Sequence, residues 1–343
     1  MRLLICTQVV DRDDLYLGFF HGWIEEMAQH FEYITVLCLK EGVHVLPKNV
    51  EVLSLGKEKG TSRVTRALRV LRWGFSKRNN YDAVLVHMNQ EYILLAGWLW
   101  KCLGKKIYMW RNHYAGTWQT DIAIRQCNKI FCTSKFSYTA KFSKNVFMPV
   151  GVDTDLYAHQ LEVARDPHAV LFYARMAPSK KAEVLLKALG ILHARSVSFV
   201  ADFYGSPLPK YEPYLIQMKT LAQELSLDRQ VRFFPGAPHS EGPRIFSAHT
   251  IFVDLGASGM YNKMLFEAAA CECLVVAASR DFAKLVDERF IFQENDAEDL
   301  ADKIESLLKL PVVEQRALGA QLCNIAKSHS LHTLGIRLAE EIV

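Results

Sequence analysis

The sequence predicts an α/β protein made of two doubly wound parallel-sheet domains. The chain has 343 residues, half of them hydrophobic, which is more than one ordinary core accommodates. Short apolar, β-branched runs alternate with stretches of helical periodicity, and this alternation is typical of a parallel sheet covered on both faces. A polar stretch that ends near residue 167 interrupts this alternation of strands and helices, which then resumes. We therefore expect domains at 1–155 and 156–330, and a terminal helix at 331–343 that returns to the first domain.

The first domain begins with a strand at 2–10, a polar loop and a helix at 21–31. The later apolar runs predict strands at 33–39, 50–55, 83–87, 106–110 and 129–133, with helices at 62–76 and 91–103.

Strands and helices alternate in the second domain as they do in the first. Strands are predicted at 168–174, 198–204, 230–234, 250–254 and 273–277, with helices at 180–195, 211–225, 241–247 and 261–270 and further helices to the end. Ligands of such sheets bind at the carboxyl ends of the strands, so two facing sheets predict a site in a central cleft.

Charge is unevenly distributed. Residues 1–150 carry 21 Lys and Arg against 12 Asp and Glu, whereas residues 151–343 carry 20 against 25. Much of the positive excess lies in Thr61 to Arg78, where arginines recur every three residues among apolar side chains. As a helix, this segment offers a basic surface for an anionic membrane or an acidic acceptor; the alternative is a helix that merely exposes its arginines to solvent. No recognised nucleic-acid-binding motif accompanies it, so we expect no nucleic-acid partner.

The sequence lacks the motifs of several enzyme classes. It has no HExxH, no GxSxG and no GxGxxG after the first strand, which disfavours zinc proteases, α/β-hydrolases and ordinary dinucleotide dehydrogenases.

Two Asp-x-Asp triplets, at 11–13 and 153–155, have a spacing that can chelate a cation but is more typical of turn and helix caps. There is no leader peptide and no apolar run of ~20 residues, so we expect a cytoplasmic protein.

Two loops of the second domain combine features that suit a pyrophosphate. Arg175 directly follows a buried strand, and Lys180 lies at the start of the next helix, so two cations and free backbone amides meet at one strand end. Gly205-Ser206-Pro207 follows the next strand, and its glycine permits the close approach of a ligand.

A third loop, Gly256 to Lys263, is rich in small residues and leads into a helix whose amides suit an anion. Glu267 lies in the apolar part of this helix. A buried carboxylate is costly unless it binds something polar, such as ribose hydroxyls, or forms an internal salt bridge.

Five motifs in this order resemble the retaining GT-B glycosyltransferases of family 4. They are Pro149-Val150-Gly151-Val152-Asp153, Ala174-Arg175 with Lys180, Gly205-Ser206-Pro207, Phe234-Pro235-Gly236, and Lys263 with Glu267-Ala268-Ala269-Ala270-Cys271. The similarity is clearest over 129–280. The chain departs from the family pattern at Gly259, where a first glutamate is usual, and at Gly18, where relatives often have a glycine pair.

The resemblance implies roles for particular residues. Catalysis would rest on His113, Arg175 and Lys180, of which the last two hold the donor diphosphate. Asp14, Gly18 and His87 would lie on the acceptor side. The implied donor-binding residues are Gly205, Ser206, Pro207, Ser258, Gly259, Met260, Tyr261, Asn262, Lys263 and Glu267.

The resemblance also implies an activity. A sugar would pass, with retention and without a metal or other cofactor, from a nucleoside-diphosphate sugar to a saccharide or lipid-linked saccharide in cell-surface glycan synthesis. UDP is the expected nucleotide, with GDP as the other option, and the inner face of the cytoplasmic membrane is a candidate location. Two alternatives remain open at this stage: a sugar-nucleotide epimerase, and a catalytically degenerate GT-B protein that acts as a binding or scaffold subunit.

Overall fold

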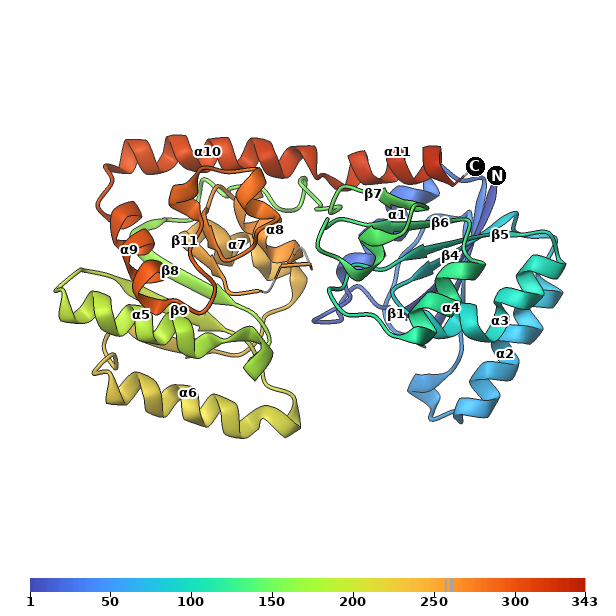
Figure 1. The fold of residues 1–343 in the computed structure, drawn as a ribbon, viewed down its shortest axis with the longest axis horizontal. Coiled ribbons are helices and arrows are strands. Elements are labelled where there is room, and N and C mark those ends of the chain that lie inside the picture. Colours follow the sequence, from blue (N-terminus) through green and yellow to red (C-terminus); the bar gives the residue numbers. More distant parts are fainter. Residues whose placement is uncertain (257, 260–261, 343) are drawn as a thin grey trace. The chain divides into compact units, whose positions relative to one another are not determined.

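The computed structural model describes residues 1–256, 258–259 and 262–342. The chain divides into two compact units, Met1–Gly151 with Leu331–Val343, and Val152–Ser330 (Figure 1). It therefore passes between them twice, at residues 151–152 and 330–331. None of the described helices is long and apolar enough to cross a membrane.

The first unit contains a seven-stranded, fully parallel sheet in the order β3-β2-β1-β4-β5-β6-β7. Its strands are β1 (Arg2–Val10), β2 (Tyr33–Glu41), β3 (Val50–Ser54), β4 (Ala83–His87), β5 (Lys106–Trp110), β6 (Lys129–Cys132) and β7 (Asn145–Phe147). Its α-helices are α1 (Phe19–Ala28), α2 (Arg63–Ser76), α3 (Glu91–Cys102), α4 (Trp118–Gln126) and α11 (Leu331–Glu341). The strand order reverses between β1 and β4, which makes their carboxyl ends the switch point of this sheet.

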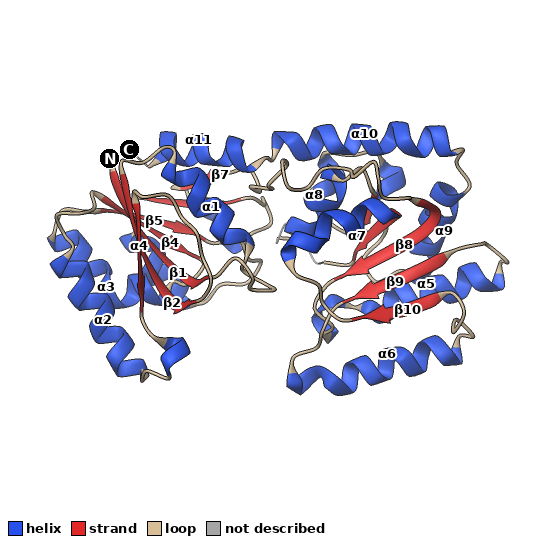
Figure 2. Ribbon diagram, turned by 180° about the vertical axis from the view of Figure 1, so that it is seen from behind, coloured by secondary structure: helices blue, strands red, loops and turns tan. Residues whose placement is uncertain are grey.

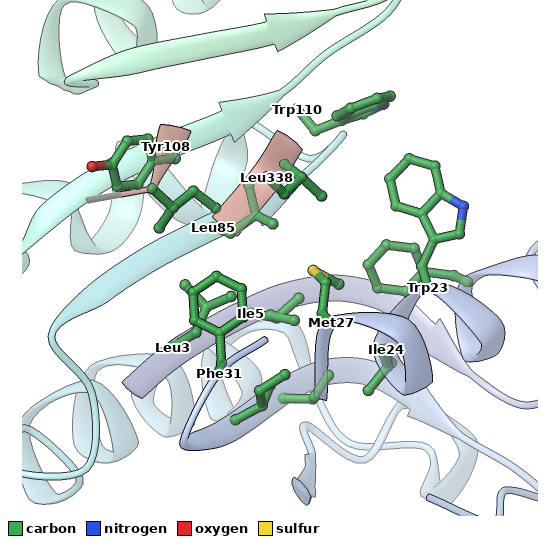
Figure 3. Packing of buried hydrophobic residues seen from close by; sticks show 14 of the residues in the cluster. Leu3, Ile5, Trp23, Ile24, Met27, Phe31, Leu85, Tyr108, Trp110 and Leu338 are labelled. Carbon is green, nitrogen blue, oxygen red and sulfur yellow. The ribbon is translucent and has the colours of Figure 1, made fainter. Parts of the chain in front are cut away.

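The centre of this sheet is buried on both faces, which explains the nearly continuous apolar run in β1. Leu3 and Ile5 of β1 belong to one core cluster, to which α1 contributes Trp23 and Met27 and α11 contributes Leu338 (Figure 3). Leu4 and Cys6 point into a second cluster, completed by Val70 of α2, Ile93 and Trp100 of α3, and Ile124 of α4. The C-terminal helix is thus part of the core of the first unit.

The second unit contains a five-stranded parallel sheet in the order β10-β9-β8-β11-β12, with helices on both faces (Figure 2). Its strands are β8 (Asp166–Tyr173), β9 (Val200–Tyr204), β10 (Val231–Phe234), β11 (His249–Asp254) and β12 (Leu274–Ala277). Its α-helices are α5 (Ala182–Ala194), α6 (Glu212–Glu224), α7 (Gly242–Ala248), α8 (Lys263–Ala270), α9 (Ala297–Leu308) and α10 (Val312–Ser328). The switch point lies between β8 and β11. The predicted class, α/β with two Rossmann-like parallel sheets, is confirmed.

Some local expectations were incomplete. Sequence periodicity missed α4, whose outward-facing Trp118 and Ile122 blur the apolar pattern, and it missed the three-residue edge strand β7. The helix predicted at 180–195 is interrupted at its start. Lys180 ends a 3₁₀ turn, Lys181 adopts a left-handed φ of 54°, and α5 begins only at Ala182.

The basic helix α2 also differs from its expected form. Ser62 caps it by accepting a hydrogen bond from the amide of Thr65 at 3.1 Å. The arginines do not form one exposed stripe, because Arg69 folds back and donates to the carbonyl of Leu55 at 2.9 Å. The exposed face instead includes the apolar side chains Val64, Leu68 and Phe75.

Candidate functional site

The structure brings the predicted residues of the second unit to one edge of its sheet, because each follows the carboxyl end of a parallel strand. Arg175 lies two residues beyond the end of β8 and is half-buried. Lys180 lies five residues further on, in the 3₁₀ turn Pro178–Lys180. The neighbouring Lys181 instead forms an ion pair with Glu294 at 2.6 Å.

The loop after β9 fits tightly against the loop after β8. The amide of Ala174 donates to the carbonyl of Tyr204 at 3.0 Å, and the amide of Met176 donates to that of Ser206 at 3.4 Å. A Cβ atom on Gly205 would lie 1.9 Å from the carbonyl oxygen of Ala174. Glycine at 205 is therefore required for the backbone contact that positions Arg175.

The loop between β11 and α8 is held by two buried aspartates. Asp254, the last residue of β11, accepts hydrogen bonds through Oδ1 from Asn262 Nδ2 at 2.9 Å and from the amide of Gly256 at 3.2 Å. Asp281 accepts one from the amide of Gly259 at 3.3 Å. These bonds direct the loop and the first turn of α8 toward the carboxyl edge of the sheet.

Gly259 has a φ of +94°, a backbone conformation that residues other than glycine rarely adopt. This gives a local physical reason for glycine at the position where the resemblance described above led us to expect a glutamate. Ser258 accepts a hydrogen bond from the amide of Arg280 at 3.0 Å, and Asn262 caps α8 through the amide of Met264 at 3.3 Å. The candidates Met260 and Tyr261 lie outside the described residues.

Helix α8 contributes a buried pair of opposite charges. Lys263 Nζ lies 3.8 Å from Glu267 Oε1, one turn away on the same face. Burial raises the pKa of Glu267, an effect that the nearby lysine opposes, and burial lowers the pKa of Lys263. The Lys263 and Glu267 side chains are 16% and 5% exposed, and a charged pair so far removed from water is costly to maintain, so polar groups of a ligand would be favourable partners for it.

A polar group around this pair was missed by the sequence analysis. Tyr157 O–H lies 2.8 Å from His239 Nδ1, and Tyr173 O–H donates to the carbonyl of Ala237 at 3.0 Å. Burial and the positive charge of Lys263 lower the pKa of His239 to about 4, so this imidazole is neutral at pH 7. Burial raises the pKa of Tyr173 to about 12, and the negative charge of Glu267 adds to this shift.

Only some of these missed residues had a usable signal in the sequence. Asp254 had one, as a carboxylate that ends an apolar strand just before a loop of small residues. Tyr157 and His239 are 82 positions apart, and nothing local in the sequence links them.

In the first unit, the predicted acceptor-side residues lie around the carboxyl ends of β1 and β4. His87 ends β4, is buried, contacts Thr7 Oγ1 through Nδ1 at 3.1 Å and stacks on Phe20 with 4.0 Å between ring centroids. Asp14 accepts hydrogen bonds from the amides of Tyr16 and Leu17, both at 3.0 Å. A Cβ atom on Gly18 would lie 2.7 Å from the carbonyl oxygen of Asp14, so these two residues shape the loop before α1.

His113 lies in the loop after β5, at the same edge of the sheet as His87. Its Nδ1 lies 2.9 Å from the amide nitrogen and 3.1 Å from the carbonyl oxygen of Ala115, so the backbone of Ala115 fixes the orientation of the ring. Its ring stacks on Tyr114 at 4.5 Å. Arg111 in the same loop is half-buried, and burial lowers its pKa.

The predicted site residues thus form two sets, one in each unit. Asp11 and Asp153, which begin the Asp-x-Asp triplets, both cap turns: each accepts from the backbone amide two residues further on. Among the described residues, one group of three or more His, Cys, Asp and Glu has converging ligand atoms, and it lies elsewhere, at Glu26, His30 and His332.

Comparison with protein families and curated proteins identifies relatives of parts of the chain. Residues 153–321 match the family model of the group 1 glycosyl transferases. A curated relative, the D-inositol 3-phosphate glycosyltransferase 1 of Catenulispora acidiphila, is 30% identical over 131 residues. This match covers 37% of the present chain and 31% of the relative, so the chain spans about a third of that protein's length.

Solved structures match nearly the whole chain. Anabaena Alr3699/HepE in complex with UDP and glucose superimposes with a TM-score of 0.78 at 17% identity, covering 99% of this chain and 98% of that one. The sucrose-phosphate synthase of Thermosynechococcus elongatus gives a TM-score of 0.76 at 15% identity, with coverage of 99% and 98%. The fold is therefore GT-B, as the sequence predicted.

Proposed function

We propose that the protein is a retaining glycosyltransferase that uses a nucleoside-diphosphate sugar as donor. The observation that carries this proposal is the convergence of Arg175, Lys180, the Gly205 turn and the start of α8 at the carboxyl edge of one parallel sheet, around its switch point. Such an edge combines two cations with the start of a helix, and both favour the negative charge of a pyrophosphate. The family match over 153–321 supports the same activity.

In this proposal the enzyme acts by positioning and by charge stabilisation. Arg175 and Lys180 bind the diphosphate and stabilise the negative charge that develops on it as the bond to the sugar breaks. Glu267 accepts hydrogen bonds from the ribose hydroxyls. The 258–263 loop orients the sugar, and a donor phosphate oxygen takes the acceptor proton on the face that the leaving group vacates. His113, in the first unit, is a further proposed catalytic residue. No metal and no covalent enzyme intermediate are required.

UDP is the proposed nucleotide, and a saccharide or lipid-linked saccharide is the proposed acceptor. The donor is supported by the UDP and UDP-glucose complexes of Anabaena Alr3699/HepE, which shares the fold. Asp14, Gly18 and His87 are the proposed acceptor-side residues, and a role in cell-surface glycan synthesis follows from an acceptor of this class.

Calorimetric titration with UDP, GDP, ADP and dTDP, first without metal and then with Mg²⁺, tests this assignment. We expect metal-independent binding of UDP. A sugar transferase then consumes UDP-glucose or another UDP-sugar only when an acceptor is present, whereas an epimerase isomerises the sugar nucleotide without one. Absence of binding by all four nucleotides would contradict the proposed site and would favour a scaffold function.

Replacing Glu267 with glutamine tests its ribose role. We expect Glu267→Gln to weaken UDP-glucose binding by about tenfold, because an amide offers one acceptor where the carboxylate offers two. Calorimetry measures this effect. The matched control is Glu224→Gln, at an exposed position at the end of α6, which should bind as the wild type does.

The affinity should also depend on pH. Because burial raises the pKa of Glu267, lowering the pH from 8 to about 6 protonates this carboxyl and weakens UDP-glucose binding in the wild type but not in Glu267→Gln. The effect of pH on stability runs in the opposite direction from its effect on binding. The folded chain holds this proton more tightly than the unfolded chain does, so the contribution of Glu267 to stability is lost as the pH rises through the raised pKa. Equal pH profiles for the two proteins would contradict the role of Glu267.

We further propose that the exposed face of α2 contacts an anionic membrane. Val64, Leu68 and Phe75 are 69%, 61% and 52% exposed, respectively. Arg63 and Arg72 on the same helix are exposed as well. Trp98, on the neighbouring helix α3, is also exposed. Apolar side chains among arginines suit the boundary between lipid head groups and acyl chains.

Co-sedimentation with vesicles measures this contact. We expect the protein to bind vesicles of phosphatidylcholine with phosphatidylglycerol more strongly than pure phosphatidylcholine, and Leu68→Glu to reduce the bound fraction several-fold by adding a buried charge at the interface. The control is Ile216→Glu on α6, where the side chain is 65% exposed. Equal binding to both vesicle types, or equal loss in both variants, would contradict the proposed face.

A further inference from the structure

Three side chains of the first unit converge where the C-terminal helix begins. Glu26 lies in the last turn of α1, His30 lies in the turn that follows the helix, and His332 is the second residue of α11. Glu26 Oε1 lies 3.0 Å from His30 Nε2 and 3.0 Å from His332 Nδ1. The side chains of Glu26, His30 and His332 are 11%, 21% and 70% exposed. Glu26 and His30 are therefore largely buried, whereas His332 leaves the cluster accessible to solvent.

We propose that Glu26, His30 and His332 form a zinc site. Two imidazole nitrogens and one carboxylate oxygen are a ligand set that Zn²⁺ prefers, with water in the fourth position. Ligand atoms of a tetrahedral zinc ion are separated by about 3.3 Å, which follows from metal–ligand bonds of about 2.0–2.1 Å. The three candidate atoms lie within 4.8 Å of one another, so small side-chain rotations bring them to that separation.

The surrounding packing keeps the three groups together. A Cβ atom on Gly335 of α11 would lie 2.5 Å from Glu26 Cγ and 3.0 Å from His30 Nε2, so glycine at 335 lets α11 approach this part of α1. Leu334 and Leu338 of α11 are buried in the core that α1 shares. Helix α1 with its following turn and helix α11, which supply the ligands, are therefore fixed against each other before any metal binds, which lowers the cost of assembling the site.

The expected role of the metal is structural. At its far end α11 is held by Glu341, whose side-chain and backbone oxygens both accept from Lys129 Nζ at 2.9 Å. The zinc site would fix the opposite end, immediately after the chain enters the first unit for the second time at residue 331. A ligand that binds only the folded state raises its stability by mass action, and here that gain would oppose detachment of the C-terminal helix.

Titration of metal-free protein with Zn²⁺ tests the site. The protein should carry no affinity tag and should carry Cys102→Ser, because Cys102 is an exposed thiol that could bind metal elsewhere. We expect one Zn²⁺ per chain by calorimetry and a rise in melting temperature with added Zn²⁺. Co²⁺ should give the visible absorption of a tetrahedral site without a thiolate charge-transfer band, which identifies nitrogen and oxygen ligands.

Variants identify the ligands. His332→Ala and Glu26→Gln should each weaken Zn²⁺ binding by at least about tenfold, because each removes one of three protein ligands. His332 is mostly exposed, so its removal should leave the metal-free melting temperature near that of the parent. The control is His44→Ala, because His44 Nε2 also lies 3.0 Å from a glutamate, Glu41, but this pair belongs to no group of three converging ligand atoms among the described residues.

Two results would overturn the proposal. In the first, the parent protein shows no Zn²⁺ binding in the micromolar range, which would mean that the cluster holds only hydrogen bonds. In the second, His332→Ala and Glu26→Gln bind Zn²⁺ as tightly as His44→Ala does, which would place the metal at other residues.

Discussion

Replacing Arg175 with alanine is expected to weaken UDP binding by roughly 10- to 150-fold. This range corresponds to the loss of about 1.5–3 kcal/mol, the usual contribution of hydrogen bonds to a charged group. Arg175 lies two residues beyond the end of β8, where its guanidinium can contact a diphosphate at the carboxyl edge of the sheet. The rate of sugar transfer should fall by more than the affinity does, because negative charge on the diphosphate increases as the sugar departs.

Lys180→Ala should act in the same direction, and Lys181→Ala is its matched control. The two lysines are adjacent, but Lys181 Nζ is already paired with Glu294, so its loss should leave UDP affinity nearly unchanged. Calorimetry with UDP and a transfer assay measure both effects, and thermal melts verify that each variant folds. Wild-type affinity in both Arg175→Ala and Lys180→Ala would refute the proposed diphosphate site.

The positions of Arg175 and Gly205 at one edge of the sheet could be predicted from the sequence because each lies within two residues of the end of a strand. Parallel strands place their carboxyl ends at one edge, so predicting β8 and β9 was enough to place Arg175 and Gly205 at the same edge. The reason for Gly259 was not predictable, because the left-handed backbone there depends on how the loop is held by Asp254 and Asp281.

The partners of these residues could not be predicted, since they come from distant parts of the chain. His239 contacts Tyr157 across 82 positions, and His332 contacts Glu26 across 306. A single histidine or tyrosine in a loop has no pattern that indicates its partner. Likewise, the sequence did not predict α4, because some of its apolar residues face solvent. The apolar periodicity on which helix prediction depends is therefore missing there.

Gly205→Ala is expected to be the most disruptive single methyl addition at the site. The new Cβ would lie 1.9 Å from the carbonyl oxygen of Ala174, and neither group can move without shifting backbone. The loops after β8 and β9 would have to separate, which breaks the 3.4 Å hydrogen bond from the amide of Met176 to the carbonyl of Ser206. We expect a destabilisation of about 3 kcal/mol and a fall in melting temperature of roughly 6–12 °C.

The same shift should reduce UDP affinity by at least about tenfold, because Arg175 is adjacent to the displaced Ala174 and a diphosphate contact fails when its donor moves by an ångström. Gly236→Ala is the control: it follows the neighbouring strand β10, and its Cβ would meet nothing closer than the amide nitrogen of Ser206 at 3.4 Å. That variant should melt and bind UDP like the wild type. If Gly205→Ala also matched the wild type in both measurements, the close contact between the two loops could not be what positions Arg175.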